Sequence, residues 1–136
     1  MLTRTSEMAL QLLVALAISD SDCPVSPKAL ARPLGVSPTY LAKVTGALAK
    51  GGILRTSRGA QGGVQLTRRP EDVSLLEIVE VCQGRILADY CEGEAEPHQV
   101  CAFHHAMSEL HTAIVSTLAR WTLADIAEHP EPAAEI

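Results

Sequence analysis

The chain has 136 residues, which is enough for one domain with a single hydrophobic core but leaves no room for a second catalytic domain. Hydrophobic residues make up 47% of the sequence, yet it contains only one Trp, two Tyr and one Phe. The core must therefore be aliphatic, as is typical of packed helices. Four cysteines in a chain with such a core do not indicate a disulfide scaffold, so thiols or metal ligands are expected.

The net charge of −5 hides a division along the chain. Residues 1–69 hold nine of the eleven Lys and Arg residues and only three acids, a balance of +6, whereas residues 70–136 have a balance of −11. A basic half is consistent with DNA binding, because its cations would release counterions from the DNA phosphates. On charge alone, a solvated surface is the simpler interpretation.

Capping signals predict three helices in the first half. The first begins at Thr5 or Ser6 and runs to about Ser19, with a broad apolar face. A serine followed by proline occurs twice and predicts the next two helices, at residues 27–32 and 39–50. Two short helices joined by a tight glycine-containing turn match the helix-turn-helix pattern, in which the second is the recognition helix.

The apolar run at residues 8–18 has a superficial likeness to a signal-peptide core. It is too short to span a membrane, and the polar Glu7 and Gln11 fit an amphipathic helix better. The sequence therefore predicts a cytoplasmic protein without a membrane partner.

Two short strands are predicted at residues 53–57 and 63–67. The segment between them, residues 58–63, reads Arg-Gly-Ala-Gln-Gly-Gly and is expected to form the wing of a winged helix-turn-helix. Ser74, with Glu77 three residues later, predicts a capping box at the start of a fourth helix. Because the wing glycines lie in a hairpin and not before a helix, they do not form a phosphate-binding loop, and no catalysis is expected.

The second half begins with an acidic stretch that has no periodicity, interpreted as a loop. From Cys101 to Trp121, apolar residues recur every three or four positions, which predicts an amphipathic helix roughly 30 Å long. The expected partner of its apolar face is the same helix of a second subunit. A short helix at residues 123–127 and a disordered tail from His129 follow.

These elements predict a mainly α fold with a small β-hairpin wing. They divide the chain into a winged helix-turn-helix DNA-binding domain (1–81), a sensor loop (82–100), a dimerisation helix with a short C-terminal helix (101–128) and a disordered tail (129–136).

The helix-turn-helix, the wing motif of residues 58–63, the capped helix at Ser74 and the Cys-Ala-Phe-His of residues 101–104 occur together. In this combination, the chain resembles the family of the iron-sulfur-cluster assembly regulator and the nitric-oxide-sensitive repressor, over residues 2–127. The resemblance implies a dimeric repressor that senses redox, iron-sulfur or nitric oxide status through an iron-sulfur cluster, expected to be 2Fe-2S.

The sequence departs from the family pattern in two places. Cluster-binding members commonly have three cysteines in the loop, whereas this chain has two, Cys91 and Cys101. The wing motif usually continues into an aromatic residue, and here Val64 follows it, which mainly changes packing.

Residues near the start of the recognition helix are expected to reach base edges or phosphates. An arginine beside glycine at the wing tip can enter a narrow minor groove. The alternative to DNA contact is a solvated loop charge for Arg58 and a half-buried position for Tyr40. The candidate DNA contacts are Ser37, Thr39, Tyr40, Lys43, Arg58, Gly59 and Gln61.

Cys91 and Cys101 are the candidate cluster ligands, because thiolates hold iron-sulfur clusters and imidazole can replace them. The resemblance implies that His104, one helical turn after Cys101, matches a ligand position in some relatives. It also implies that Glu7 can supply the fourth ligand from the partner subunit. His98 of the loop is the other candidate for that position.

The alternative for the loop cysteines is a pair of metal-free thiols that form a disulfide on oxidation. Cys23 and Cys82 are expected to be packing residues.

The main prediction is a homodimer whose two recognition helices enter successive major grooves of a palindromic operator. Two alternatives stay open: a cluster-free, thiol-based transcription regulator of the same fold, and a metal or redox protein that does not bind DNA.

Overall fold

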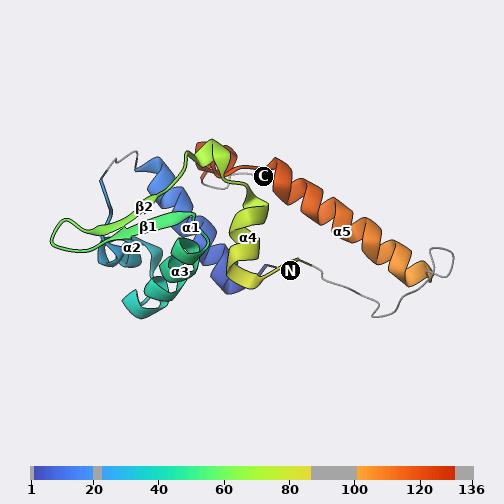
Figure 1. Cartoon of the computed structure of the whole chain (residues 1–136), viewed down its shortest axis with the longest axis horizontal. Helices are drawn as coiled ribbons and strands as arrows, with labels where there is room; N and C mark the ends of the chain where they lie inside the picture. The colour runs from blue at the N-terminus through green and yellow to red at the C-terminus, as the bar shows by residue number, and fades with distance from the viewer. Residues whose placement is uncertain (1, 20–22, 87–100, 131–136) are drawn as a thin grey trace, which may run out of the picture.

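The structure, a computed structural model, describes residues 2–19, 23–86 and 101–130. Short helices and a hairpin form one body, and a single long helix, α5 (Ala102–Arg120), projects from it (Figure 1). The predicted fold class, mainly α with a β-hairpin wing, is confirmed. The elements of the body are α1 (Arg4–Ile18), α2 (Pro27–Leu34), α3 (Pro38–Lys50), β1 (Leu54–Ser57), β2 (Gly63–Leu66), η1 (Pro70–Asp72), α4 (Leu75–Gln83) and α6 (Leu123–Glu128).

Serine and threonine caps begin most of the helices, but α1 begins earlier than the sequence predicts. The Thr3 hydroxyl accepts the Ser6 backbone N–H at 3.2 Å, so Thr3 is the N-cap and the predicted cap at Thr5 or Ser6 is wrong. Ser6 is instead buried in the first turn, where its hydroxyl has a partner on another helix, Gln83.

The helix-turn-helix consists of α2 and α3. Helix α2 continues through Pro33 to Leu34, two residues beyond its predicted end. Gly35 then ends it with a left-handed φ of 65°, a conformation that favours glycine. The Ser37 hydroxyl caps α3 by accepting the Tyr40 backbone N–H at 3.2 Å.

The hairpin pairs β1 with β2 from Leu54 opposite Leu66 to Ser57 opposite Gly63, each strand one residue shorter than predicted. A third segment, which the sequence pattern does not predict, lies beside the hairpin. Val25 and Val64 exchange backbone hydrogen bonds of 2.9 and 2.8 Å, which join the α1–α2 connection to β2. A Cβ at Gly63 would collide with the Val25 carbonyl, so the close approach requires glycine.

Helix α4 shows half of its predicted capping box. The Ser74 hydroxyl accepts the Glu77 backbone N–H at 3.2 Å, but the Glu77 carboxylate pairs with Arg68 and not with the Ser74 backbone. A complete capping box begins α6, between Thr122 and Asp125. The backbone and side-chain hydrogen bonds from Thr122 lower the pKa of the Asp125 carboxyl.

Helix α6 returns the chain from α5 to the body. The Leu123 N–H donates to the Val73 carbonyl at 2.8 Å, and the Leu75 N–H donates to the Trp121 carbonyl at 2.9 Å. These bonds place α6 against α1. The core that results is aliphatic, as predicted, and its largest fully buried side chains are Leu12, Leu13, Leu41, Leu48, Ile53, Leu54, Ile78 and Leu123.

Of the residues predicted to form the disordered tail, 131–136 lie outside the described residues. Within the part of the chain that the structure covers, no helix is both long and apolar enough to cross a membrane.

We expect Leu123→Ala to lower the free energy of unfolding by about 2–5 kcal/mol, because it leaves a cavity where α6 meets α1. Denaturant unfolding at fixed protein concentration measures the change. The matched control is Ile18→Ala, which truncates a side chain that is 53% exposed and should change stability by less than about 0.5 kcal/mol. Equal effects of the two substitutions would show that α6 is not part of the core.

Candidate nucleic-acid interface and sensor region

Helix α3 presents one face to the core and the opposite face to solvent. Its buried residues, Leu41, Val44, Thr45 and Leu48, recur every three or four positions. Of the predicted DNA contacts, Thr39 and Lys43 are exposed on the opposite face. Tyr40 is half-buried and packs against the core, the alternative position considered for it.

The exposed face of α3 extends further than the sequence analysis proposed. Ala42, Gly46 and Lys50 are also exposed, in register with Thr39 at helical spacing. The same spacing in the sequence could have located them. On a helix, Thr39 and Lys43 stand out as DNA contacts by their polar side chains, whereas Ala42 and Gly46 have no polar side chain.

The wing lies beside the helix-turn-helix and extends beyond it at one end of the molecule (Figure 1). Arg58, Gly59 and Gln61, the predicted DNA contacts of the wing, are all exposed. Gly59 has a φ of 105°, so the backbone of the turn by itself favours glycine there. Arg55 on β1 is exposed as well and adds a cation that the sequence analysis did not select.

Eight of the nine basic residues of the first half fall into two groups, and the ninth, Arg4, is exposed at the start of α1. Arg68 pairs with Glu77 and Arg69 pairs with Glu71, near the start of α4. Within the described ranges these are the recorded ion pairs, so the cations of α2, α3 and the hairpin have no acidic partner there. Those cations are Lys28, Arg32, Lys43, Lys50, Arg55 and Arg58, all exposed. This group is the surface that can attract phosphates.

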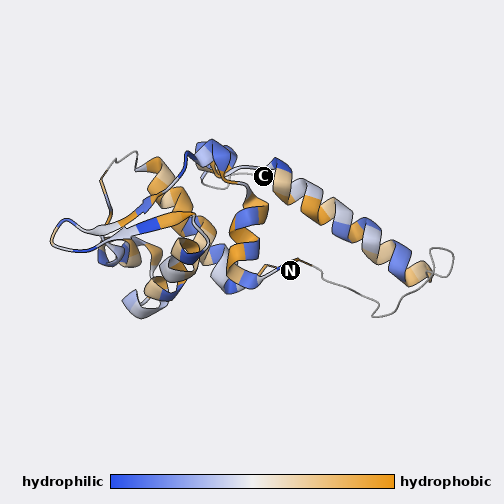
Figure 2. Cartoon of the chain, in the orientation of Figure 1, coloured by the Kyte–Doolittle hydropathy of each residue, from blue (hydrophilic) through white to orange (hydrophobic). Residues whose placement is uncertain are grey.

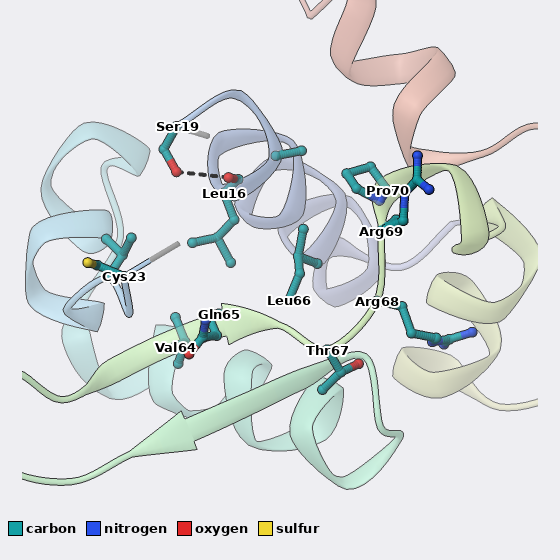
Figure 3. Close-up of a pocket in the computed structure, with 12 residues that line it drawn as sticks. Leu16, Ser19, Cys23, Val64, Gln65, Leu66, Thr67, Arg68, Arg69 and Pro70 are labelled. Atoms are coloured by element: carbon teal, nitrogen blue, oxygen red, sulfur yellow. Dashed lines mark hydrogen bonds between the residues drawn. The ribbon is translucent and has the colours of Figure 1, made fainter. Parts of the chain in front are cut away.

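A cavity of about 340 Å³ lies between the end of α1 and strand β2 (Figure 3). Leu16, Val64 and Leu66 line it with apolar surface. Arg68 and Arg69 also line it, but in Figure 3 both side chains extend away from the space between α1 and β2. Because their charges are paired with acids elsewhere, the cavity has no arginine charge available for a ligand.

The two cysteines predicted as packing residues differ. Cys82 on α4 packs against the core, and burial raises the pKa of its thiol. Cys23 borders the cavity and is exposed, so its predicted packing role is wrong. Figure 3 shows Cys23 at the edge of this cavity.

The candidate cluster ligands are only partly within the described residues. Cys101 is exposed at the N-cap of α5, and His104 lies one turn further along, partly exposed. Cys91 and His98 lie outside the described residues. Glu7 is exposed on α1, and the beginning of α5 lies well away from α1 in Figure 1. Over the described ranges, no three metal-binding side chains gather at one point, so within one chain Glu7 does not join Cys101 and His104.

A hydrogen-bond cluster joins the start of α1 to the last residue of α4, Gln83, which falls within the predicted sensor loop (82–100). The Gln83 side-chain carbonyl accepts the Ser6 hydroxyl at 2.7 Å and the Thr3 backbone N–H at 2.9 Å. The sequence analysis missed these contacts, because the partners are about eighty positions apart and no periodic pattern links them.

Helix α5 has no buried residue in the structure. Its apolar side chains include Phe103, 63% exposed, and Leu110, 49% exposed, and Trp121 at its C-cap is 44% exposed. Figure 2 shows apolar residues recurring along this helix although it projects from the body. A solvent-exposed apolar stripe of this length is unusual for an isolated chain.

Residues 2–129 match the family model of Rrf2, described as an iron-dependent transcriptional regulator. The chain belongs to the Rrf2 family. It is 30% identical over 129 residues to the HTH-type transcriptional regulator NsrR of Halalkalibacterium halodurans, a match that covers 92% of this chain and 88% of that protein. Rrf2 regulators are not enzymes, which confirms the predicted absence of catalysis.

Two solved structures show the same Rrf2 fold. IscR of T. potens has a TM-score of 0.78 and 27% identity, with 100% of this chain and 92% of that chain covered. CymR of B. subtilis, titled the global cysteine regulator, has a TM-score of 0.82 and 24% identity, with 96% of this chain and 98% of that chain covered. Rrf2 regulators bind DNA and are usually dimers, so the chain is a DNA-binding transcription regulator.

Proposed function

We propose that this Rrf2 regulator is a homodimeric repressor that binds a palindromic operator in the cytoplasm and responds to redox, iron-sulfur or nitric oxide status. The observation that carries the DNA-binding part is that α3 and the wing both carry exposed cations, which have no acidic partner among the described residues. Acids are concentrated in the other half of the sequence.

In the proposed complex, α3 enters the major groove. Thr39 and Lys43 lie on its exposed face in the first two turns, where recognition helices contact base edges. Ser37 and Tyr40 position the helix, because the Ser37 hydroxyl caps it and the Tyr40 ring packs on the core. The wing then reaches the flanking minor groove with Arg58, while Gly59 and Gln61 shape the turn beside the phosphates.

Arg58→Ala should weaken operator binding by roughly tenfold, because a minor-groove arginine and its phosphate field are lost. It should also reduce the slope of log K against log salt by about 1. Fluorescence anisotropy with a duplex selected by the wild-type chain from a random-sequence library measures both.

Arg4→Ala is the matched control, because it removes the same charge from an exposed position at the start of α1, away from the wing. Operator affinity should stay unchanged in this variant. If wild-type protein selects no sequence from the library, the regulator proposal is wrong.

The proposed dimer forms along α5. A second copy of the helix would cover the exposed stripe that contains Phe103, Leu110 and Trp121, which nothing in the described chain covers. An interface between identical helices is symmetric, and it would hold the two recognition helices at a fixed distance from each other. This spacing is what a palindromic operator requires, with half-sites about one helical turn apart or a multiple of it.

Leu110→Glu should convert the dimer to a monomer, because it buries an unpaired carboxylate in the interface. Sedimentation velocity gives the mass. The domain should stay folded, since Leu110 makes no core contact. Thr112→Glu places the same charge on the far side of α5, where it should leave the dimer intact. A Leu110→Glu protein that sediments as a dimer would refute this interface.

We propose an iron-sulfur cluster as the sensor, with Cys91, Cys101 and His104 as ligands. Cys101 and His104 fit such a group, because a thiolate donor and an imidazole donor lie one turn apart at an exposed helix start. The fourth ligand is Glu7 of the partner subunit or His98; within one chain Glu7 is too far from the start of α5. A bound cluster would supply the redox- and nitric-oxide-sensitive chemistry.

A thiol-based sensor of the same fold is the second candidate. The observation that favours it is the sequence itself, which has two cysteines in the region where the cluster-binding members it resembles commonly have three. An exposed Cys101 is accessible to oxidants in either case.

Cys101→Ala should abolish the visible chromophore, iron and sulfide of anaerobically purified protein, because one thiolate ligand is lost. Cys91→Ala should have the same effect. The control is Cys23→Ala, which removes another exposed thiol, one that borders the cavity between α1 and β2, and should keep the chromophore. A colourless wild-type protein without iron would instead favour the thiol-based sensor.

A further inference from the structure

Nearly every glycine in the described chain has a structural reason to be glycine. Gly35, Gly52, Gly59 and Gly84 have positive φ angles, between 65° and 105°. Three others lie against neighbours that a Cβ would strike. Gly51 faces the Val81 side chain, Gly62 faces the backbone at Ser57, and Gly63 faces the Val25 carbonyl.

Gly46 is the exception among these described glycines. It lies inside α3, with no positive φ, and its position is exposed. A Cβ built on it would meet nothing within 4 Å. Neither the backbone nor the packing of this chain therefore requires glycine at this position.

A glycine inside a helix carries a cost in stability. It loses more backbone entropy on folding than alanine does, and alanine is the best helix former. The packing around α3 would accept alanine, so the fold would be more stable with it. Within the described chain, this cost in stability has no compensating contact or backbone requirement.

Two exposed lysines flank Gly46 on α3. It lies on the exposed face of α3, three residues after Lys43 and four before Lys50, opposite the buried face of the helix. Both lysines are exposed cations with no ion pair recorded in the described ranges. A surface between two such cations faces the phosphates and groove of bound DNA.

We propose that Gly46 is a positioning residue at which the major-groove surface of the operator comes into van der Waals contact with the main chain of α3. This inference rests on the proposed operator binding. Without a Cβ at Gly46, the helix axis can lie closer to the DNA, so that Thr39 and Lys43 reach deeper into the groove. A side chain here would hold α3 away from the bases.

The test is Gly46→Ala, with thermal unfolding and DNA affinity measured on the same full-length protein. The melting temperature should rise by roughly 3 °C, because alanine replaces an exposed helical glycine. Affinity for a duplex that the wild-type chain selects from a random-sequence library should fall at least about tenfold, comparable to a base-pair mismatch. Affinity for unselected duplex DNA at the same salt should fall less, since phosphate contacts tolerate a small displacement.

A size series separates contact from helix flexibility. Gly46→Ser and Gly46→Gln should weaken selective binding progressively, with Gln below Ser and Ser below the wild type. If Gly46→Ala is more stable and binds the selected duplex as tightly as the wild type, the inference is wrong while operator binding stands. If the wild-type chain selects no sequence, operator binding itself fails, and this inference fails with it.

Discussion

Helix α1 is the element on which the other parts of the body are assembled. Helices α2, α3, α4 and α6 and strand β2 all pack against it. Its aliphatic face, which includes Leu12 and Leu13 at 0% exposure, fixes the buried side of α3 and therefore decides which side of α3 faces outward. The exposed side carries the candidate DNA contacts, so recognition depends on the packing of a helix that itself makes none of the proposed contacts.

Helix α4 is held at both ends. Its beginning exchanges backbone hydrogen bonds with the junction between α5 and α6, and its end is bonded through Gln83 to Thr3 and Ser6 of the first turn of α1. Residues 84–100, which include the proposed ligand Cys91, follow this second connection in the sequence. A change in that segment would therefore act on the same helix against which α3 is packed. Helix α4 thus links that segment to α3 through the contacts described above. A regulator that switches between two states needs such a link.

Local chemistry allowed much of this arrangement to be predicted from the sequence. The serine-proline starts of α2 and α3, the glycine-rich wing and the period of α5 each depend on residues a few positions apart. The features that the sequence does not predict depend on contacts between residues farther apart in the chain. Thr3 caps α1 in place of Ser6 because Ser6 is bonded to Gln83, and the Glu77 carboxylate leaves its capping box because Arg68 is nearby. The exposure of Cys23 also depends on how the chain is arranged in space, because the residue borders a cavity that β2 and the end of α1 line.

The candidate site also has positions that local sequence predicts and positions that depend on distant parts of the chain. The positions of Thr39, Lys43 and Arg58 on an exposed surface follow from helical spacing and from the hairpin, both of which can be read from the sequence. The separation of Glu7 from the start of α5 could not be read there, because it depends on the direction in which α5 leaves the body. Gly46 was missed because a residue without a side chain leaves no chemical pattern to recognise.

The backbone exchange between Val25 and Val64 anchors the base of the wing to the connection between α1 and α2. The tip, from Arg58 to Gln61, is exposed and has no such anchor. The hairpin is therefore fixed at its base, and its length sets how far the tip extends. The sequence of the tip can change without disturbing the base. A substitution at the tip would therefore alter the proposed contact with DNA while the base of the wing stays joined to the α1–α2 connection.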